Sequence, residues 1–291
     1  MSTDLRHSKV TIGELALHVV ESGPPEGRPF LFLHGWPESW RTWLDVMDAA
    51  GAGRPDARII AIDLPGIGGS AGGAGGGSKL RLAETIHALV RHLDLTGVTL
   101  VGHDAGGMAA YSYLRRFDDA ERVVIMNTVI PGVDPWNEVL RNPYIWHFGL
   151  HAVPDLPEAL VQGRQAEYFD YFYDVLSADP SRISAASRAA HAAAYGSDAA
   201  LTAGFDLYRE FPQDALDNSA FAEAGAVDIP LLYVRGDREG GDIDAYARGF
   251  HDAGVKNLTT ATVADAGHFA QEEQPAEVWR IIHDFAYTFA S

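Results

Sequence analysis

Short apolar segments alternate with amphipathic segments along the first 126 residues, and this alternation limits the chain to few fold classes. The apolar segments are rich in leucine or β-branched residues and are bounded by Gly, Pro or Asp, as is typical of strands. Between two of them, Leu82, Ile86 and Leu89 recur at helical spacing, and Ser78 is a candidate N-cap. Strands that alternate with helices predict a mostly parallel, doubly wound α/β sheet covered on both faces. The predicted strands are 15–20, 30–33, 59–62, 98–101 and 123–126.

The same alternation returns near the C-terminus. Residues 231–234 and 258–263 have strand character, a helical segment lies between them, and a final helix begins near Pro275. The intervening part of the chain has no strand signal and is rich in Ala, Tyr, Phe and Trp, with frequent prolines. We therefore predict one α/β core with an inserted helical cap. The expected boundaries are 1–131 and 227–291 for the core and 132–226 for the cap.

Composition and charge exclude several classes of partner. The chain has 22 Lys and Arg against 40 Asp and Glu, a formal net charge of −18, so it repels nucleic-acid phosphates and anionic membranes. It has no cysteine, which excludes disulfides, thiolate metal sites and cysteine nucleophiles. We see no apolar run long enough to cross a membrane and no signal peptide in residues 1–10. We therefore expect a cytoplasmic globular protein without nucleic-acid or membrane partners.

The segment 102–107, Gly-His-Asp-Ala-Gly-Gly, follows a predicted strand and precedes a predicted helix. Small residues two before and two after a central side chain allow a sharp strand-to-helix turn that exposes this side chain. The central residue is usually Ser, and here it is Asp104. A carboxylate needs no base to become a nucleophile at neutral pH, and a helix N-terminus stabilises its charge. The alternative is an Asp that simply caps an ordinary helix.

Other turns at predicted strand ends favour the nucleophile interpretation. The segment 34–37, His-Gly-Trp-Pro, follows the strand 30–33, and we expect the backbone N–H groups of Trp36 and Ala105 to converge on one oxygen. His268 follows the strand 258–263 and suits a general base. Taken separately, the segment 34–37 could be a simple turn and His268 a structural histidine.

With these motifs the chain resembles the α/β-hydrolase superfamily, and within it the epoxide hydrolases, over almost its whole length. The resemblance implies the α/β-hydrolase fold, an Asp nucleophile and no cofactor or metal. Haloalkane dehalogenases usually have Trp directly after the nucleophile, and fluoroacetate dehalogenases have Arg there. This chain has Ala105 at that position.

The resemblance also assigns two proton donors in the cap that hold the epoxide oxygen. The segment 204–209, ending in Tyr-Arg, looks like the family's Tyr-Arg motif, which makes Tyr208 the first donor. The segment 146–148, Trp-His-Phe, looks like that of the subgroup with a Tyr/His pair, which makes His147 the second. Tyr144 is the other candidate for the second donor. For both Tyr208 and His147 the alternative is an ordinary packing role. His147 and His151 have the spacing of two zinc ligands, but no third ligand is evident.

The acid that orients His268 is expected in the loop after the strand 231–234. The family's usual place is three residues after a Gly, and Gly236 points to Glu239. Asp237 and Asp242 are the alternatives in the same loop. Some relatives take the acid from the end of the preceding strand, but this chain has Asn127 there, which carries no charge.

These residues predict a cofactor-independent epoxide hydrolase acting on a small-molecule epoxide. Asp104 attacks an epoxide carbon while Tyr208 and His147 bind the opening oxygen, and water activated by His268 hydrolyses the resulting ester. A dehalogenase with a halide site from Trp146 and Tyr208, a non-catalytic ligand-binding protein and a biosynthetic enzyme for a larger epoxide remain alternatives. The oligomeric state, including a homo-oligomer, is left open.

Overall fold

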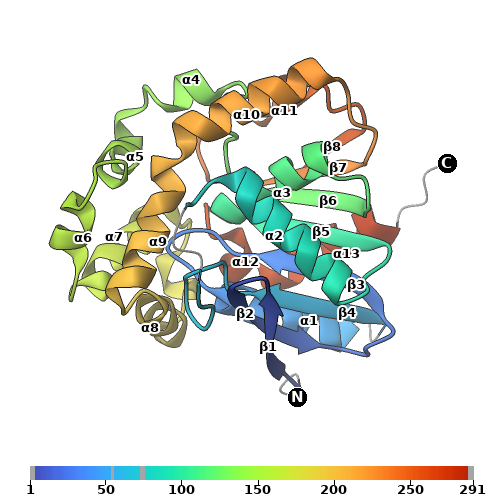
Figure 1. The fold of residues 1–291 in the computed structure, drawn as a ribbon, viewed down its shortest axis with the longest axis horizontal. Coiled ribbons are helices and arrows are strands. Elements are labelled where there is room, and N and C mark those ends of the chain that lie inside the picture. Colours follow the sequence, from blue (N-terminus) through green and yellow to red (C-terminus); the bar gives the residue numbers. More distant parts are fainter. Residues whose placement is uncertain (1–3, 54–55, 73–75, 288–291) are drawn as a thin grey trace.

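The computed structural model describes residues 4–53, 56–72 and 76–287. An eight-stranded sheet runs through its centre in the order β1-β2-β4-β3-β5-β6-β7-β8 (Figure 1). β1 and β2 form an antiparallel hairpin, β2 pairs antiparallel with β4, and the remaining neighbours are parallel. The predicted mostly parallel sheet is confirmed. The strands are β1 (Arg6–Ile12), β2 (Leu15–Ser22), β3 (Arg28–Leu33), β4 (Ala57–Ile62), β5 (Val98–His103), β6 (Ala120–Met126), β7 (Leu231–Gly236) and β8 (Leu258–Val263).

The two faces of the sheet bury different side chains because successive residues of a strand point to opposite faces. In β3, Phe30 and Phe32 pack with Trp43, whereas Leu31 and Leu33 belong to the cluster on the other face. The first face is covered by α1 and α13, and the second by α2, α3 and α11. The core helices are η1 (Trp40–Trp43), α1 (Leu44–Gly53), α2 (Lys79–His92), α3 (Ala105–Arg116), α11 (Ile243–Asp252), α12 (Ala270–Glu273) and α13 (Pro275–Tyr287).

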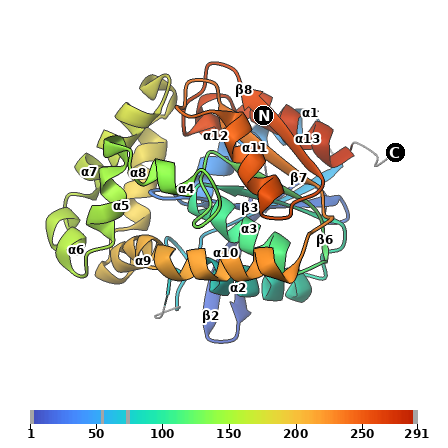
Figure 2. The same cartoon turned by 90° about the horizontal axis from the view of Figure 1, so that it is seen from above.

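The chain between β6 and β7 is helical, as the sequence predicts for 132–226, and no strand occurs in it. Figures 1 and 2 show α5 to α9 gathered at one side of the sheet, and Figure 2 shows α10 returning beside α2. The domain boundaries themselves stay a prediction. The elements are α4 (Trp136–Val139), η2 (Pro143–Ile145), α5 (Trp146–His151), α6 (Leu156–Val161), α7 (Gln165–Leu176), η3 (Pro180–Arg182), α8 (Ala185–Ala194), α9 (Asp198–Arg209) and α10 (Phe211–Ala224).

One strand does not follow from the apolar pattern. β1 lies mostly exposed and buries only Val10, so it lacks the apolar run by which most of the other strands are found. It pairs with β2 along its whole length, and Gly13 adopts a positive φ of 60° in the tight turn between the two strands. None of the helices in the described part of the chain is both long and apolar enough to cross a membrane.

Candidate active site

The site begins at the sharp turn between β5 and α3. Asp104 has φ 48° and ψ −119°, a strained conformation for a residue other than glycine. The turn is so tight that a Cβ atom on Gly102 would lie 2.2 Å from the backbone oxygen of Gly106. A Cβ on Gly106 would in turn lie 2.5 Å from the backbone oxygens of Leu33 and His34. The small residues around Asp104 are therefore required for this turn.

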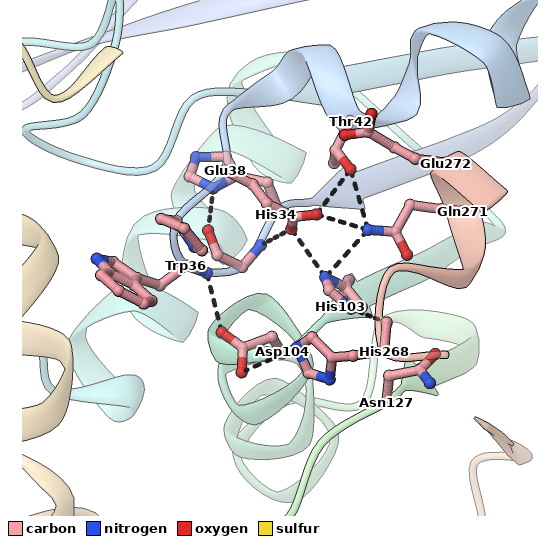
Figure 3. Close-up of polar contacts among 12 residues, drawn as sticks. His34, Trp36, Glu38, Thr42, His103, Asp104, Asn127, His268, Gln271 and Glu272 are labelled. Atoms are coloured by element: carbon pink, nitrogen blue, oxygen red, sulfur yellow. Dashed lines mark hydrogen bonds and ion pairs between the residues drawn. The ribbon is translucent and has the colours of Figure 1, made fainter. Parts of the chain in front are cut away.

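The loop after β3 holds one oxygen of the Asp104 carboxylate. The backbone N–H of Trp36 donates a hydrogen bond to Oδ1 of Asp104, with a length of 2.9 Å. Gly35 allows this approach, because a Cβ there would lie 2.4 Å from Cβ of Asp104. Figure 3 shows Asp104 between Trp36 and His268. The second predicted donor, Ala105, is the first residue of α3 and is buried next to Asp104.

His268 lies on the other side of Asp104. Its Nε2 is 3.9 Å from Oδ2 of Asp104, too long for a hydrogen bond, and its Nδ1 is 2.8 Å from Oε1 of Glu239. The structure therefore brings Asp104, His268 and Glu239 together in the predicted order. The two alternative acids point elsewhere: Asp237 pairs with the exposed Arg238, and Asp242 caps α11 by accepting from the N–H of Asp244.

Glu239 has two further partners on its second oxygen. The amide of Asn127 donates to Oε2 at 2.7 Å, and the guanidinium of Arg235 lies 3.0 Å from the same atom. The nearby charge of Arg235 and the hydrogen bonds from His268 and Asn127 overcome burial and lower the pKa of Glu239 to about 2. Asn127, at the alternative acid position, thus supports Glu239 as a hydrogen-bond donor.

A buried ion pair behind the site, missed at the level of sequence, joins the two loops that flank Asp104 (Figure 3). Oε2 of Glu38 accepts from the N–H of Gly35 at 2.9 Å and lies 2.8 Å from Nδ1 of His103. Nε2 of His103 lies 2.8 Å from the backbone oxygen of His268. Although burial opposes it, the charge of Glu38 raises the pKa of His103 to about 9, and His103 lowers the pKa of Glu38. The charged His103 donates from both ring nitrogens and fixes both loops.

Tyr208 and His147 face the site from the helices between β6 and β7. Tyr208 is 4% exposed and His147 is 7% exposed, and their ring centroids are 5.9 Å apart. Burial raises the pKa of Tyr208 well above its usual value. Burial, assisted by the charge of His268, lowers the pKa of His147 to about 3, so its imidazole is neutral at pH 7. The rival Tyr144 is 80% exposed.

His151 lies beneath this pair and has a packing role. Its Nε2 is 2.8 Å from the hydroxyl of Tyr168, and its ring packs 4.5 Å from that of Tyr208. Within the described residues there is no group of three or more His, Cys, Asp or Glu arranged to hold a metal ion.

A cavity of about 820 Å³ connects these side chains to the surface. Asp104, His147, Tyr208 and His268 are among the residues that line it. Apolar side chains line much of the rest, together with charged side chains such as Glu138, Arg141 and Arg248. Trp146, the other halide ligand of the dehalogenase alternative, is 42% exposed and is not among the lining residues. The apolar lining includes Trp36, Val129, Val139, Phe148, Phe172 and Leu176.

Comparison with known proteins covers almost the whole chain. The alpha/beta hydrolase fold family matches residues 28–275. A soluble epoxide hydrolase of Corynebacterium sp. (strain C12) is 30% identical over 283 residues, covering 94% of this chain and 95% of the relative. The solved structure of the epoxide hydrolase CorEH without ligand has a TM-score of 0.85 at 27% identity, covering 97% of this chain and 98% of its own. A haloalkane dehalogenase of Psychrobacter cryohalolentis is 26% identical over 297 residues and covers 94% of this chain and 88% of its own. The chain therefore belongs to the alpha/beta hydrolase fold family and, within it, to the epoxide hydrolases.

Proposed function

We propose that the protein hydrolyses an epoxide to a vicinal diol through an ester of Asp104. The observation that carries this proposal is a carboxylate, in place of a serine, at the strained turn, with a base on one side and two buried donors across the cavity. A carboxylate attacks a strained ether carbon directly, and the donors assist the departure of the oxygen. The helices between β6 and β7 then act as the cap that supplies these donors.

In the first step Oδ2 of Asp104 is the attacking atom, because Oδ1 is held by the N–H of Trp36. A bond forms between Oδ2 and an epoxide carbon while the bond from this carbon to the epoxide oxygen breaks. The oxygen accepts hydrogen bonds from the N–H of His147 and the hydroxyl of Tyr208, and Tyr208 gives it a proton and becomes a phenolate. Both side chains carry a proton at pH 7, since burial keeps Tyr208 protonated and leaves the neutral His147 with one N–H.

In the second step water attacks the carbonyl carbon of the Asp104 ester. Nε2 of His268 takes the proton from this water, and Glu239 at Nδ1 compensates the imidazolium charge. The N–H groups of Trp36 and Ala105 stabilise the oxyanion. The bond from the carbonyl carbon to the diol oxygen then breaks, and this oxygen takes the proton held by His268. The second proton of the water, left on the carboxyl group of Asp104, is released and replaces the proton that Tyr208 gave up, which restores all three side chains.

The test uses His268→Ala, which keeps the first step and removes the base of the second. After addition of an aliphatic epoxide such as 1,2-epoxyoctane, intact-protein mass spectrometry should show one added epoxide mass, located in the peptide that contains Asp104. In the wild-type enzyme, a single turnover in oxygen-18 water should label Asp104 and leave the diol unlabelled. An adduct at another residue, or label in the diol after one turnover, would remove Asp104 from its proposed role.

A dehalogenase is the second candidate, because a haloalkane dehalogenase is among the relatives. It would use the same Asp104 and His268 but needs donors for a halide. Ala105 supplies no side-chain donor next to Asp104, and Trp146 does not line the cavity. Assays of 1-bromohexane and chloroacetate for halide release, alongside epoxides for diol, decide between the two. A protein that turns over neither would fit the ligand-binding alternative.

A further inference from the structure

Arg235 is the one charged residue in its strand, β7. β7 reads Leu-Leu-Tyr-Val-Arg-Gly, and all six residues are buried, with Arg235 itself 5% exposed. An arginine cannot lose its proton in a protein, so a buried guanidinium must find acceptors. Arg235 lies on the same face of the strand as Tyr233, two residues earlier, and this face leads to the carboxyl end where His268 and Glu239 meet.

The acceptors of Arg235 lie in the turn that carries Glu239 and on β7 itself. One terminal nitrogen donates to the hydroxyl of Tyr233 at 2.9 Å. The other donates to the backbone oxygen of Gly240 at 2.6 Å and lies 3.0 Å from Oε2 of Glu239. The guanidinium also stacks over the ring of Tyr246, 4.3 Å from its centroid. Arg235 therefore holds both the side chain of Glu239 and the backbone of the following residue.

The carboxylate of Glu239 thus lies between His268 and Arg235 and interacts with both. Its Oε1 is 2.8 Å from Nδ1 of His268, and its Oε2 faces Arg235. A carboxylate beside an imidazole favours the imidazolium, whereas a cation behind that carboxylate opposes it. The charged and titratable groups that face His268 are Glu239 after β7, Asp104 after β5, His103 at the end of β5 and His147 on α5.

We propose that Arg235 is a positioning residue of the catalytic acid: it fixes Glu239 against His268 and offsets the carboxylate charge, so that His268 remains an unprotonated base at lower pH. This inference rests on the proposed function for its kinetic consequence. His268 can activate water only when Nε2 is free to accept a proton. Arg235 therefore extends ester hydrolysis toward acidic pH while it keeps the imidazole in place.

The test compares Arg235→Gln with Arg235→Lys. The midpoint of His268 protonation is measured from its ring C–H signals by NMR, assigned with His268→Ala, and ester hydrolysis is followed in single turnovers from pH 5 to 9. Removal of the cation should raise both midpoints by about half to one pH unit. Arg235→Lys keeps the charge and should leave both midpoints within about 0.3 units, although it cannot contact all three acceptors at once.

Arg238→Gln is the matched control. Arg238 lies in the same loop and its side chain is 61% exposed, where it pairs with Asp265 and Asp237. Because solvent screens this charge, its removal should not move the midpoint of His268. A midpoint that stays unchanged or falls in Arg235→Gln, or that rises equally in Arg238→Gln, overturns the inference. Should Arg235→Gln not fold, a midpoint shift above about half a unit in Arg235→Lys overturns it.

Failure of the proposed function gives a different result. The NMR titration needs no substrate, so it tests Arg235 even if no ester forms on Asp104. Absence of the ester with a raised His268 midpoint in Arg235→Gln would reject epoxide hydrolysis and retain the role of Arg235.

Discussion

The buried ion pair between Lys79 and Asp214 offers a direct test of what connects the core to the helices over the site. Lys79 is the first residue of α2, Asp214 lies on α10, and both side chains are 1% exposed. Nζ of Lys79 lies 2.8 Å from Oδ2 of Asp214 and also donates to the backbone oxygens of Gly77 and Leu207. All protons of the ammonium group are therefore used, and the residue after Leu207 is Tyr208.

Lys79→Met should lower the free energy of unfolding by about 3–5 kcal/mol, because it leaves a buried carboxylate without its cation and two carbonyl groups without their donor. The double variant Lys79→Met/Asp214→Asn should recover about half of this loss, since the uncharged amide still accepts from the backbone N–H of residue 79. Urea unfolding at pH 7, followed by far-ultraviolet circular dichroism, measures both values.

Lys256→Met is the control for the same substitution at the surface. Lys256 pairs with Asp228 at 3.1 Å, but the two side chains are 57% and 75% exposed, so its loss should cost less than about 1 kcal/mol. Equal effects of Lys79→Met and Lys256→Met would refute the argument from burial. A double variant no more stable than Lys79→Met would show that the unpaired charge of Asp214 is not the cause.

The other predictions concern the site. Tyr208→Phe should slow ester formation roughly 30- to 1000-fold in rapid-quench assays, while Tyr144→Phe, at an exposed position, should not; equal rates in both would move the donor role elsewhere. Glu239→Gln should slow ester hydrolysis at least about 100-fold and let the ester accumulate, whereas Asp237→Asn should not, and the reverse pattern would make Asp237 the acid. The pKa of His103 is raised to about 9 in the fold, so its ion pair contributes fully below the unfolded value of 6.5 and is lost as pH rises through 9. His103→Gln should therefore flatten the fall in melting temperature between pH 7 and 9.5, and an unchanged slope would contradict this assignment.

Much of the sheet could be predicted because β3 to β7 are buried on both faces and therefore appear as short apolar runs. The turn at Asp104 could be predicted because its geometry requires glycine at fixed positions, and the local sequence shows them. The expected closeness of Glu239 to His268 followed from a family spacing and is found at 2.8 Å, while its role stays a prediction. β1 was missed because an exposed hairpin strand needs no apolar run.

The polar contacts that support the site could not be predicted, because they join residues far apart in the sequence. Glu38 and His103 are 65 residues apart, and Lys79 and Asp214 are 135 apart. Each residue alone is an ordinary charged side chain, and only the fold shows which partner it has. The sequence did contain one signal of such a contact. Arg235 is a charge within an otherwise uncharged buried strand, and a buried charge requires a partner.

Asp104 differs from the carboxylates of Asp214 and Glu239 in its partners. Asp214 is paired with Lys79, and Glu239 with Arg235, so their charges are compensated and their oxygens are held. Within the described residues Asp104 pairs with no lysine or arginine; it has the N–H of Trp36 on Oδ1 and the ring of His268 at 3.9 Å from Oδ2. A cation bound to Oδ2 would lower its nucleophilicity and occupy the place where a substrate carbon must approach. The fold thus places a cation against Asp214 and against Glu239 but none against Oδ2 of Asp104, which agrees with the attack that we propose for this oxygen.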